Sequence, residues 1–113
     1  MIYNLDKINE LAEGDNDFIM AVVGVFLEEV PQDLAELEVA LRQKNFESVY
    51  KLAHKIKPNV DLLGMEDTRK IALNIETLGK KGKSEEAEIT RLVPLLKEDI
   101  NQVVSELKND FSF

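Results

Sequence analysis

The sequence predicts an all-α protein, an antiparallel up-down-up-down four-helix bundle with a short N-terminal capping helix. Leu, Ala, Glu and Lys recur at helical spacing along almost the whole chain, and strand signals are few. No internal repeat or low-complexity stretch interrupts this pattern. The length of 113 residues fits one domain over residues 1–113, and substantial amphipathic helices joined by short connections favour a bundle.

The first two helices are separated by turn residues. A short helix is expected at Leu5–Glu13, ended by the glycine that follows it, and Asp15 or Asn16 is expected to cap the next helix. Apolar residues then recur at helical spacing on both sides of Pro31, and no cluster of Gly, Asn or Ser separates the two halves. We therefore expect one long helix over residues 16–43 that is kinked at Pro31.

The third helix is expected to run from Phe46 to Leu63 and to stop at Gly64, because glycine readily adopts the left-handed conformation. The fourth helix is expected to start near Glu66 or Asp67, since acidic side chains favour the positive end of a helix dipole.

The chain between the fourth helix and the last one again contains turn residues. Gly79 and Gly82 are expected to close the fourth helix, and Ser84 offers an N-cap to the last one. The apolar stripe of the last helix continues to Leu107 beyond Pro94, a residue that can bend the helix.

The composition excludes several classes of function. The 22 acidic and 14 basic side chains give a net charge of −8, which repels a phosphate backbone and argues against a nucleic-acid binder. No apolar run approaches the roughly 20 residues of a membrane span, and the N-terminus lacks the layout of a secretory signal, so we expect a cytoplasmic protein that does not bind membranes. Without cysteine and with one histidine, disulfides, thiolate metal sites and multi-histidine metal sites are excluded.

Charge is spread unevenly along the chain. Residues 51–83 are the only third in which basic side chains outnumber acidic ones, and this third contains His54 with Lys51, Lys55 and Lys57 close by. Such a cluster is what a site for an anionic group or an acidic partner needs. The alternative is an ordinary mixed surface.

His54 is the only side chain of the sequence whose ordinary titration lies near neutral pH. At about 100° per residue, the apolar residues of its helix fall on the opposite side, so the imidazole is expected to face water. Lys57 lies one turn later on the same face, where its ammonium can reach an anion carried by the imidazole, and Lys51 lies one turn earlier. A solvated histidine without a special role is the alternative.

The segment H-K-I-K-P at His54–Pro58, with Gly64 ten residues after the histidine, resembles the H-x-L-K-G helix of the histidine-containing phosphotransfer (HPt) family of two-component phosphorelays. Other segments similar to this family follow the family's order along nearly the whole chain: G-D-N-D-F from Gly14, F-L-E-E-V-P from Phe26, K-N-F from Lys44, and Ile75-Glu76.

The resemblance implies that His54 is the phosphoacceptor and that Lys57 stabilises the phosphate. It implies a phosphoryl carrier without autokinase activity, which exchanges phosphate with aspartates in receiver domains of response regulators or hybrid histidine kinases. The receiver would supply magnesium, so no cofactor is expected in this chain. The sequence also lacks a G-x-x-x-x-G-K-[ST] loop and has no room for a kinase ATP-binding domain.

The sequence departs from the family at Pro58, where glycine is usual, and at Lys55, where a small or polar residue is frequent. Proline removes an amide donor and clashes with the carbonyl of residue i−4, here His54. We therefore expect a bend or widened turn at His54–Pro58, with the freed carbonyl bonded to water or a side chain. Lys55 and Asp61, which adds a negative charge to the histidine face, either tune partner choice or are ordinary solvent-exposed charges.

The second helix carries more apolar residues than a core needs. Its apolar positions spread over about 200°, whereas a helix facing a core needs about 100°. Phe18 and Val25 lie at one edge of this spread and are candidates for a docking patch beside His54. Burial in the core is the alternative for either residue.

Two other functions stay open. A histidine-kinase dimerisation and phosphoacceptor domain also carries histidine on a helix, but its box places proline five residues after the histidine, whereas Pro58 is four after His54. Such domains form dimers of helical hairpins, whereas we expect a monomer. A noncatalytic helical adaptor, in which His54 is incidental, is the other alternative. Met1 and a complete bundle favour a free-standing protein over a fragment of a hybrid kinase.

Overall fold

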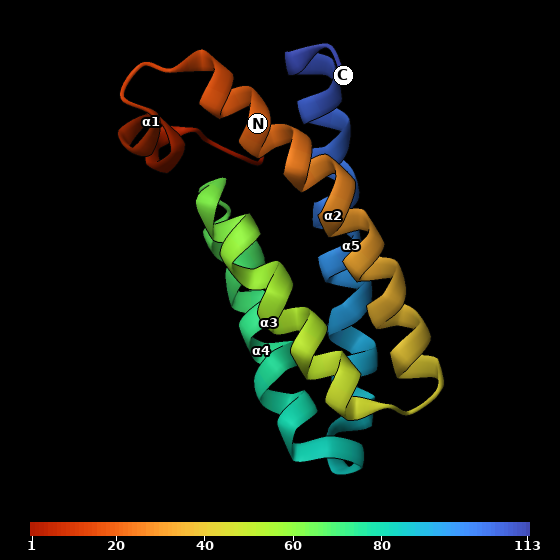
Figure 1. The fold of residues 1–113 in the computed structure, drawn as a ribbon. Coiled ribbons are helices and arrows are strands. Elements are labelled where there is room, and N and C mark those ends of the chain that lie inside the picture. The colour runs from red at the N-terminus through yellow and green to blue at the C-terminus, as the bar shows by residue number, and fades with distance from the viewer.

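The computed structural model describes residues 1–113 and contains helices and no strand. Four long helices lie side by side, and a short one lies at one end of them (Figure 1). The predicted all-α bundle is therefore confirmed. The elements are α1 (Asp6–Ala12), α2 (Asn16–Arg42), α3 (Phe46–Leu62), α4 (Glu66–Lys81), the 3-10 turn η1 (Gly82–Glu85) and α5 (Glu86–Phe111).

The helices α2 and α5 extend past the α3–α4 hairpin, at the end of the bundle where both termini lie (Figure 1). The short helix α1 lies over this end, as predicted. The amide of Asn4 donates to the carbonyl of Leu63 over 2.9 Å, and Lys7 pairs with Asp61 over 2.7 Å. These contacts attach the N-terminal segment to the end of the α3–α4 hairpin.

The side of α3 opposite His54 forms part of the core. Val49, Ile56, Val60 and Leu63 are buried as predicted, whereas Leu52 is only partly buried. Burial of each such side chain contributes roughly 1.5–3 kcal/mol relative to exposure. The apolar stripe of α3 therefore orients the helix and leaves His54 on the outside.

The starts of α2 and α3 show how local chemistry sets helix boundaries. The Asp15 side chain accepts from the amides of Asp17 and Phe18 over 3.0 and 3.3 Å, which confirms it as the cap of α2. Asn45 caps α3 by accepting from the Ser48 amide over 3.2 Å. The single helix predicted through Pro31 is also confirmed; the kink remains a prediction.

Two predicted boundaries were wrong. Gly79 does not close α4 but lies buried inside it, where a Cβ would come 2.9 Å from the Tyr50 Cβ and 3.2 Å from the Tyr50 nitrogen. Its lack of a side chain lets α3 and α4 approach closely. Ser84 does not cap the last helix, because residues Gly82–Glu85 form a 3-10 turn and α5 starts after it without a side-chain cap.

The widened turn predicted around Pro58 is absent, because α3 continues as an α-helix from Phe46 to Leu62. The nearby side-chain bond to the backbone runs from Asn59 Nδ2 to the Lys55 carbonyl over 3.1 Å, one residue beyond the carbonyl that Pro58 leaves without its amide donor. Pro58 lies on the exposed side of the helix, where water can bond to a freed carbonyl.

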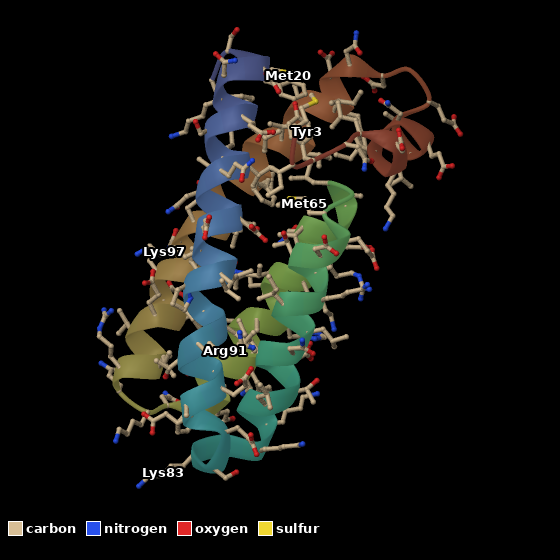
Figure 2. The ribbon with its side chains drawn as sticks, turned by 180° about the vertical axis from the view of Figure 1, so that it is seen from behind. Tyr3, Met20, Met65, Lys83, Arg91 and Lys97 are labelled. Carbon is tan, nitrogen blue, oxygen red and sulfur yellow. The ribbon has the colours of Figure 1, made fainter.

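The N-terminal segment closes the end of the bundle where both termini lie. Seen from behind, Tyr3 and Met65 lie at the same end of the molecule, and both are buried (Figure 2). The Tyr3 hydroxyl donates to Asp110 Oδ2 over 2.6 Å, and the Ile2 amide donates to Glu106 Oε1 over 2.9 Å. The N-terminal segment thus contacts the last turns of α5 as well as the hairpin.

Candidate functional site

His54 projects from α3 with 68% of its side chain exposed, as the helical pattern predicted. Its Nδ1 lies 2.8 Å from Oε2 of Glu76 on α4. An ionised carboxylate can only accept a hydrogen bond, so this contact assigns the ring proton to Nδ1 in the neutral imidazole. The lone pair of Nε2, on the far side of the ring, is left free for chemistry.

Glu76 is the acidic residue that joins the two helices of the site. Only 7% of its side chain is exposed, and its Oε1 accepts from Lys57 Nζ over 2.8 Å. Burial raises the pKa of the Glu76 carboxyl, but hydrogen bonds from Lys57 and His54 outweigh burial and hold that pKa below its ordinary value. The carboxylate therefore stays charged beside the imidazole at neutral pH.

Lys57 lies at the expected place on the histidine face, but its ammonium is directed toward Glu76. Its side chain is 25% exposed, less than half the exposed fraction of His54. In this arrangement the ammonium supports the imidazole indirectly, through the carboxylate that both contact. Direct contact of Lys57 with a phosphate on His54 stays a prediction.

A hollow of about 350 Å³ lies beside the imidazole, on the side of α4. The ammonium of Lys80 borders this hollow, 3.6 Å from Glu76 Oε2 and 5.8 Å from the centre of the Tyr50 ring. Its lining residues are Tyr50, Lys51, His54, Glu76 and Lys80. Three cationic or protonatable side chains thus surround a space large enough for a small anion.

The lysines next to His54 in sequence have separate partners. Lys51 pairs over 2.8 Å with Glu47 on its own helix, and this pair is exposed to water. Lys55 pairs over 3.1 Å with Asp33 of α2, whose side chain is buried. The Lys55 side chain is 56% exposed, as that alternative described, and it also contacts a buried carboxylate.

The remaining supporting residues lie farther along α3. Asp61 contacts Lys7 over 2.7 Å and Arg69 over 3.7 Å, so it links α1 and α4 to α3. Gly64 has a φ of +68°, and a Cβ there would lie 2.3 Å from the Asn4 side chain. Both residues shape the end of the bundle and do not contact His54.

Phe18 and Val25 are exposed on α2, which favours the docking-patch interpretation over burial in the core. Together with residues of α3 they line a shallow groove of about 270 Å³. The lining residues are Phe18, Ala21, Val22, Val25, Asn59 and Leu62. The groove places apolar side chains on the α2 side of the helix that carries His54.

The role of Glu76 was missing from the sequence analysis. A signal for it exists, because an acidic residue stands within the buried stripe of α4 that includes Ala72, Ile75 and Gly79. Acidic side chains are rarely buried without a cationic partner. The identity of the partners could not be read from the sequence, since His54 and Lys57 belong to another helix.

No three His, Cys, Asp or Glu side chains come together in a way that could hold a metal ion. None of the helices combines the length and the apolarity that crossing a membrane requires.

The family model of the Hpt domain matches residues 21–106, a range that contains α3, α4 and most of α2 and α5. His54, Lys57 and Glu76 all lie inside the matched range. Neither the curated proteins nor the solved structures give a match to the chain.

Proposed function

The chain belongs to the Hpt domain family, and from this premise we propose that it relays a phosphoryl group through His54 between receiver-domain aspartates. Family membership implies a phosphocarrier role in two-component signalling. The observation that carries the finer proposal is the bond from His54 Nδ1 to the buried Glu76 carboxylate, which leaves Nε2 exposed as the nucleophile.

In the proposed transfer, the Nε2 lone pair of His54 attacks the phosphorus of an aspartyl phosphate. The nitrogen–phosphorus bond forms as the bond from phosphorus to the aspartate oxygen breaks, and the electron pair leaves with the carboxylate. The proton on Nδ1 stays in its hydrogen bond to Glu76, whose negative charge stabilises the positive charge that develops on the ring. The reverse steps return the group to another aspartate.

The receiver domain would complete the site around His54. Phosphoryl transfer requires in-line placement and neutralisation of the phosphoryl oxygens, and we propose that the receiver supplies the magnesium ion for this purpose. The Hpt chain supplies the nucleophile, and Lys57 positions Glu76 through its 2.8 Å hydrogen bond. The exposed groove at Phe18 and Val25 is the proposed docking surface for the receiver.

The proposal includes a carrier that does not phosphorylate itself from ATP and that acts as a cytoplasmic monomer. The sequence supports the first point by lacking a phosphate-binding loop. The fold supports the monomer, because one chain contributes all the long helices of the bundle. The histidine-kinase dimerisation domain, by contrast, needs two chains to complete a bundle.

The test is incubation of the purified protein with a panel of phosphorylated receiver domains, with a His54→Gln variant in parallel. We expect acid-labile, base-stable phosphate on the native protein and none on the variant. Circular dichroism of both proteins controls for folding, which we expect the variant to keep because His54 is exposed and lies outside the apolar core. If no receiver labels the folded native protein, the adaptor interpretation takes its place.

A further inference from the structure

The hollow beside His54 contains a cation that the phosphocarrier role leaves unassigned. Lys80 of α4 lines this space with His54, whereas Lys57 is absent from the lining. The Lys80 ammonium lies near Glu76 Oε2, the same oxygen that accepts from His54 Nδ1. Because the two contacts share one oxygen, the ammonium of Lys80 lies close to the Nδ1 side of the imidazole.

The Lys57 ammonium cannot reach a phosphate on His54 without giving up its hydrogen bond to Glu76. Its ammonium donates a 2.8 Å hydrogen bond to Glu76 Oε1, and the Glu76 side chain is almost fully buried. Moving that ammonium to a phosphoryl oxygen would take a hydrogen bond away from a buried carboxylate, which is costly. The phosphoryl group would also be a second anion close to Glu76, whose carboxylate would then lack the Lys57 ammonium.

The Lys80 ammonium, unlike that of Lys57, donates no hydrogen bond to Glu76. It lies 3.6 Å from Glu76 Oε2, beyond hydrogen-bond distance, and the Lys80 side chain is 59% exposed. Lys51, the other lysine in the lining, already donates a 2.8 Å hydrogen bond to Glu47. Lys80 is therefore the lining cation that can turn toward a new anion without breaking a hydrogen bond.

We propose that Lys80 is the cation that contacts the phosphoryl group on Nε2 of phosphorylated His54, and that Lys57 is a positioning residue acting through Glu76. The proposal rests on His54 as the phosphoacceptor. Phosphorylation adds negative charge to the hollow, and the Lys80 ammonium moves from the neighbourhood of Glu76 to a phosphoryl oxygen. Glu76 keeps its bonds to Lys57 and to the ring proton on Nδ1.

The test uses the full chain and phosphoramidate, a small donor that needs no receiver. The Nε2 lone pair of His54 attacks phosphorus, the nitrogen–phosphorus bond to histidine forms, and the donor's own nitrogen–phosphorus bond breaks to release ammonia. Phosphorus NMR against pH then reports the second ionisation of the phosphoryl group. A nearby ammonium favours the dianion, so we expect Lys80→Ala to raise the pKa of this phosphoryl group by about 0.5.

The matched control is Lys81→Ala, which removes the same charge from the next residue of α4, where the side chain is also exposed. We expect Lys81→Ala and Lys80→Arg to leave the phosphoryl pKa within about 0.1 of the native value, since Lys81 does not line the hollow and Lys80→Arg keeps the charge. Equal pKa values in Lys80→Ala and Lys81→Ala would overturn the proposal. A larger rise in Lys57→Ala than in Lys80→Ala would also overturn it, because Lys57 would then be the contacting cation.

The outcome separates this proposal from the relay function. A phosphoryl pKa that depends on Lys80, in a protein that no receiver labels, supports the Lys80 contact and contradicts the relay. If receivers label His54 but the phosphoryl pKa does not change in Lys80→Ala, the relay is supported and the Lys80 contact is contradicted. If phosphoramidate leaves His54 unmodified in the folded protein, the Lys80 proposal is overturned together with its premise.

Discussion

The two nitrogens of the His54 ring lie in different surroundings, and this difference decides which of them can act as a nucleophile. Nδ1 is bonded to a nearly buried carboxylate, whereas most of the ring is exposed to water. Glu76 in turn depends on Lys57, because a buried carboxylate without a cationic partner is unfavourable. The reactive state of one surface residue therefore depends on two others, one of them on the neighbouring helix.

Replacing Glu76 with Ala tests this dependence. Without the carboxylate, the ring proton is no longer held on Nδ1, so nitrogen NMR of His54 should show a larger share of the tautomer protonated at Nε2. We expect the rate of labelling by phosphorylated receivers to fall roughly tenfold, as when an orienting partner of a functional histidine is lost. Glu47→Ala, which removes an exposed carboxylate from α3, is the control. An unchanged tautomer ratio in Glu76→Ala would contradict the assignment.

The same carboxylate makes stability depend on pH. The pKa of Glu76 is lower in the folded protein than its ordinary value of 4.5, so the folded state favours the ionised form. Its contribution to the free energy of unfolding is therefore fully present above about pH 4.5 and is lost as pH falls through the lower folded-state pKa. We expect Glu76→Gln to be less stable than the native protein at pH 7, with a smaller difference at pH 3. Urea unfolding at both pH values measures this, and a difference that grows in acid would refute it.

At the scale of helices, the site depends on how closely α3 and α4 pack. Gly79 lies opposite Tyr50, one turn of helix from Glu76, so the glycine contact and the carboxylate contact share one face of α4. A methyl group at Gly79 would meet the Cβ and backbone of Tyr50, which cannot move aside as a flexible side-chain end could. The helix separation that brings Glu76 to His54 therefore requires a residue without a side chain at this position.

Two glycine substitutions within helices are expected to act in opposite directions. Gly79→Ala gains helix propensity but overpacks the α3–α4 contact, so we expect a net loss of about 1–3 kcal/mol in the free energy of unfolding. At Gly24 of α2, a Cβ would make only an ordinary contact with Phe113 at 3.7 Å. Gly24→Ala should therefore stabilise the protein by about 0.5–1 kcal/mol. Urea unfolding compares the two variants, and equal effects would contradict the close-packing role of Gly79.

The helices were predictable from the sequence because apolar spacing and capping residues are local signals. Asp15 caps α2 and Gly64 ends α3 as expected, since each acts on its own or the next few residues. Gly79 was misinterpreted because its role depends on Tyr50, a residue of another helix. The exposure of His54 followed from periodicity, but its bond to Glu76 joins residues 22 positions apart, and the sequence alone does not show such a contact.

At the scale of the whole molecule, the two ends of the chain close the bundle beyond the α3–α4 hairpin. The first residues lie against the last turns of α5, through the bonds of Ile2 to Glu106 and of Tyr3 to Asp110. The amide of Asn4 reaches the end of α3 at Leu63. The C-terminal end of α3, the helix that carries His54, is thus held by a segment from the start of the chain.

The Tyr3 contact makes this closure sensitive to alkali. Burial, together with the hydrogen bond to Asp110 and the negative charges of Asp110 and Glu106, raises the pKa of Tyr3 from 10.0 to about 12. Since the folded state holds this proton more tightly, its contribution to stability is fully present below pH 10 and is lost as pH rises through 12. Ultraviolet absorbance of the native protein should therefore show tyrosine ionisation extending toward pH 12. Tyr3→Phe should remove the part of this ionisation that occurs near pH 12. Because burial is the largest cause, Asp110→Asn should bring the pKa of Tyr3 only part of the way back from about 12 toward 10.0. A late ionisation that persists in Tyr3→Phe would place the perturbed hydroxyl elsewhere and would leave the closure of the bundle without this pH dependence.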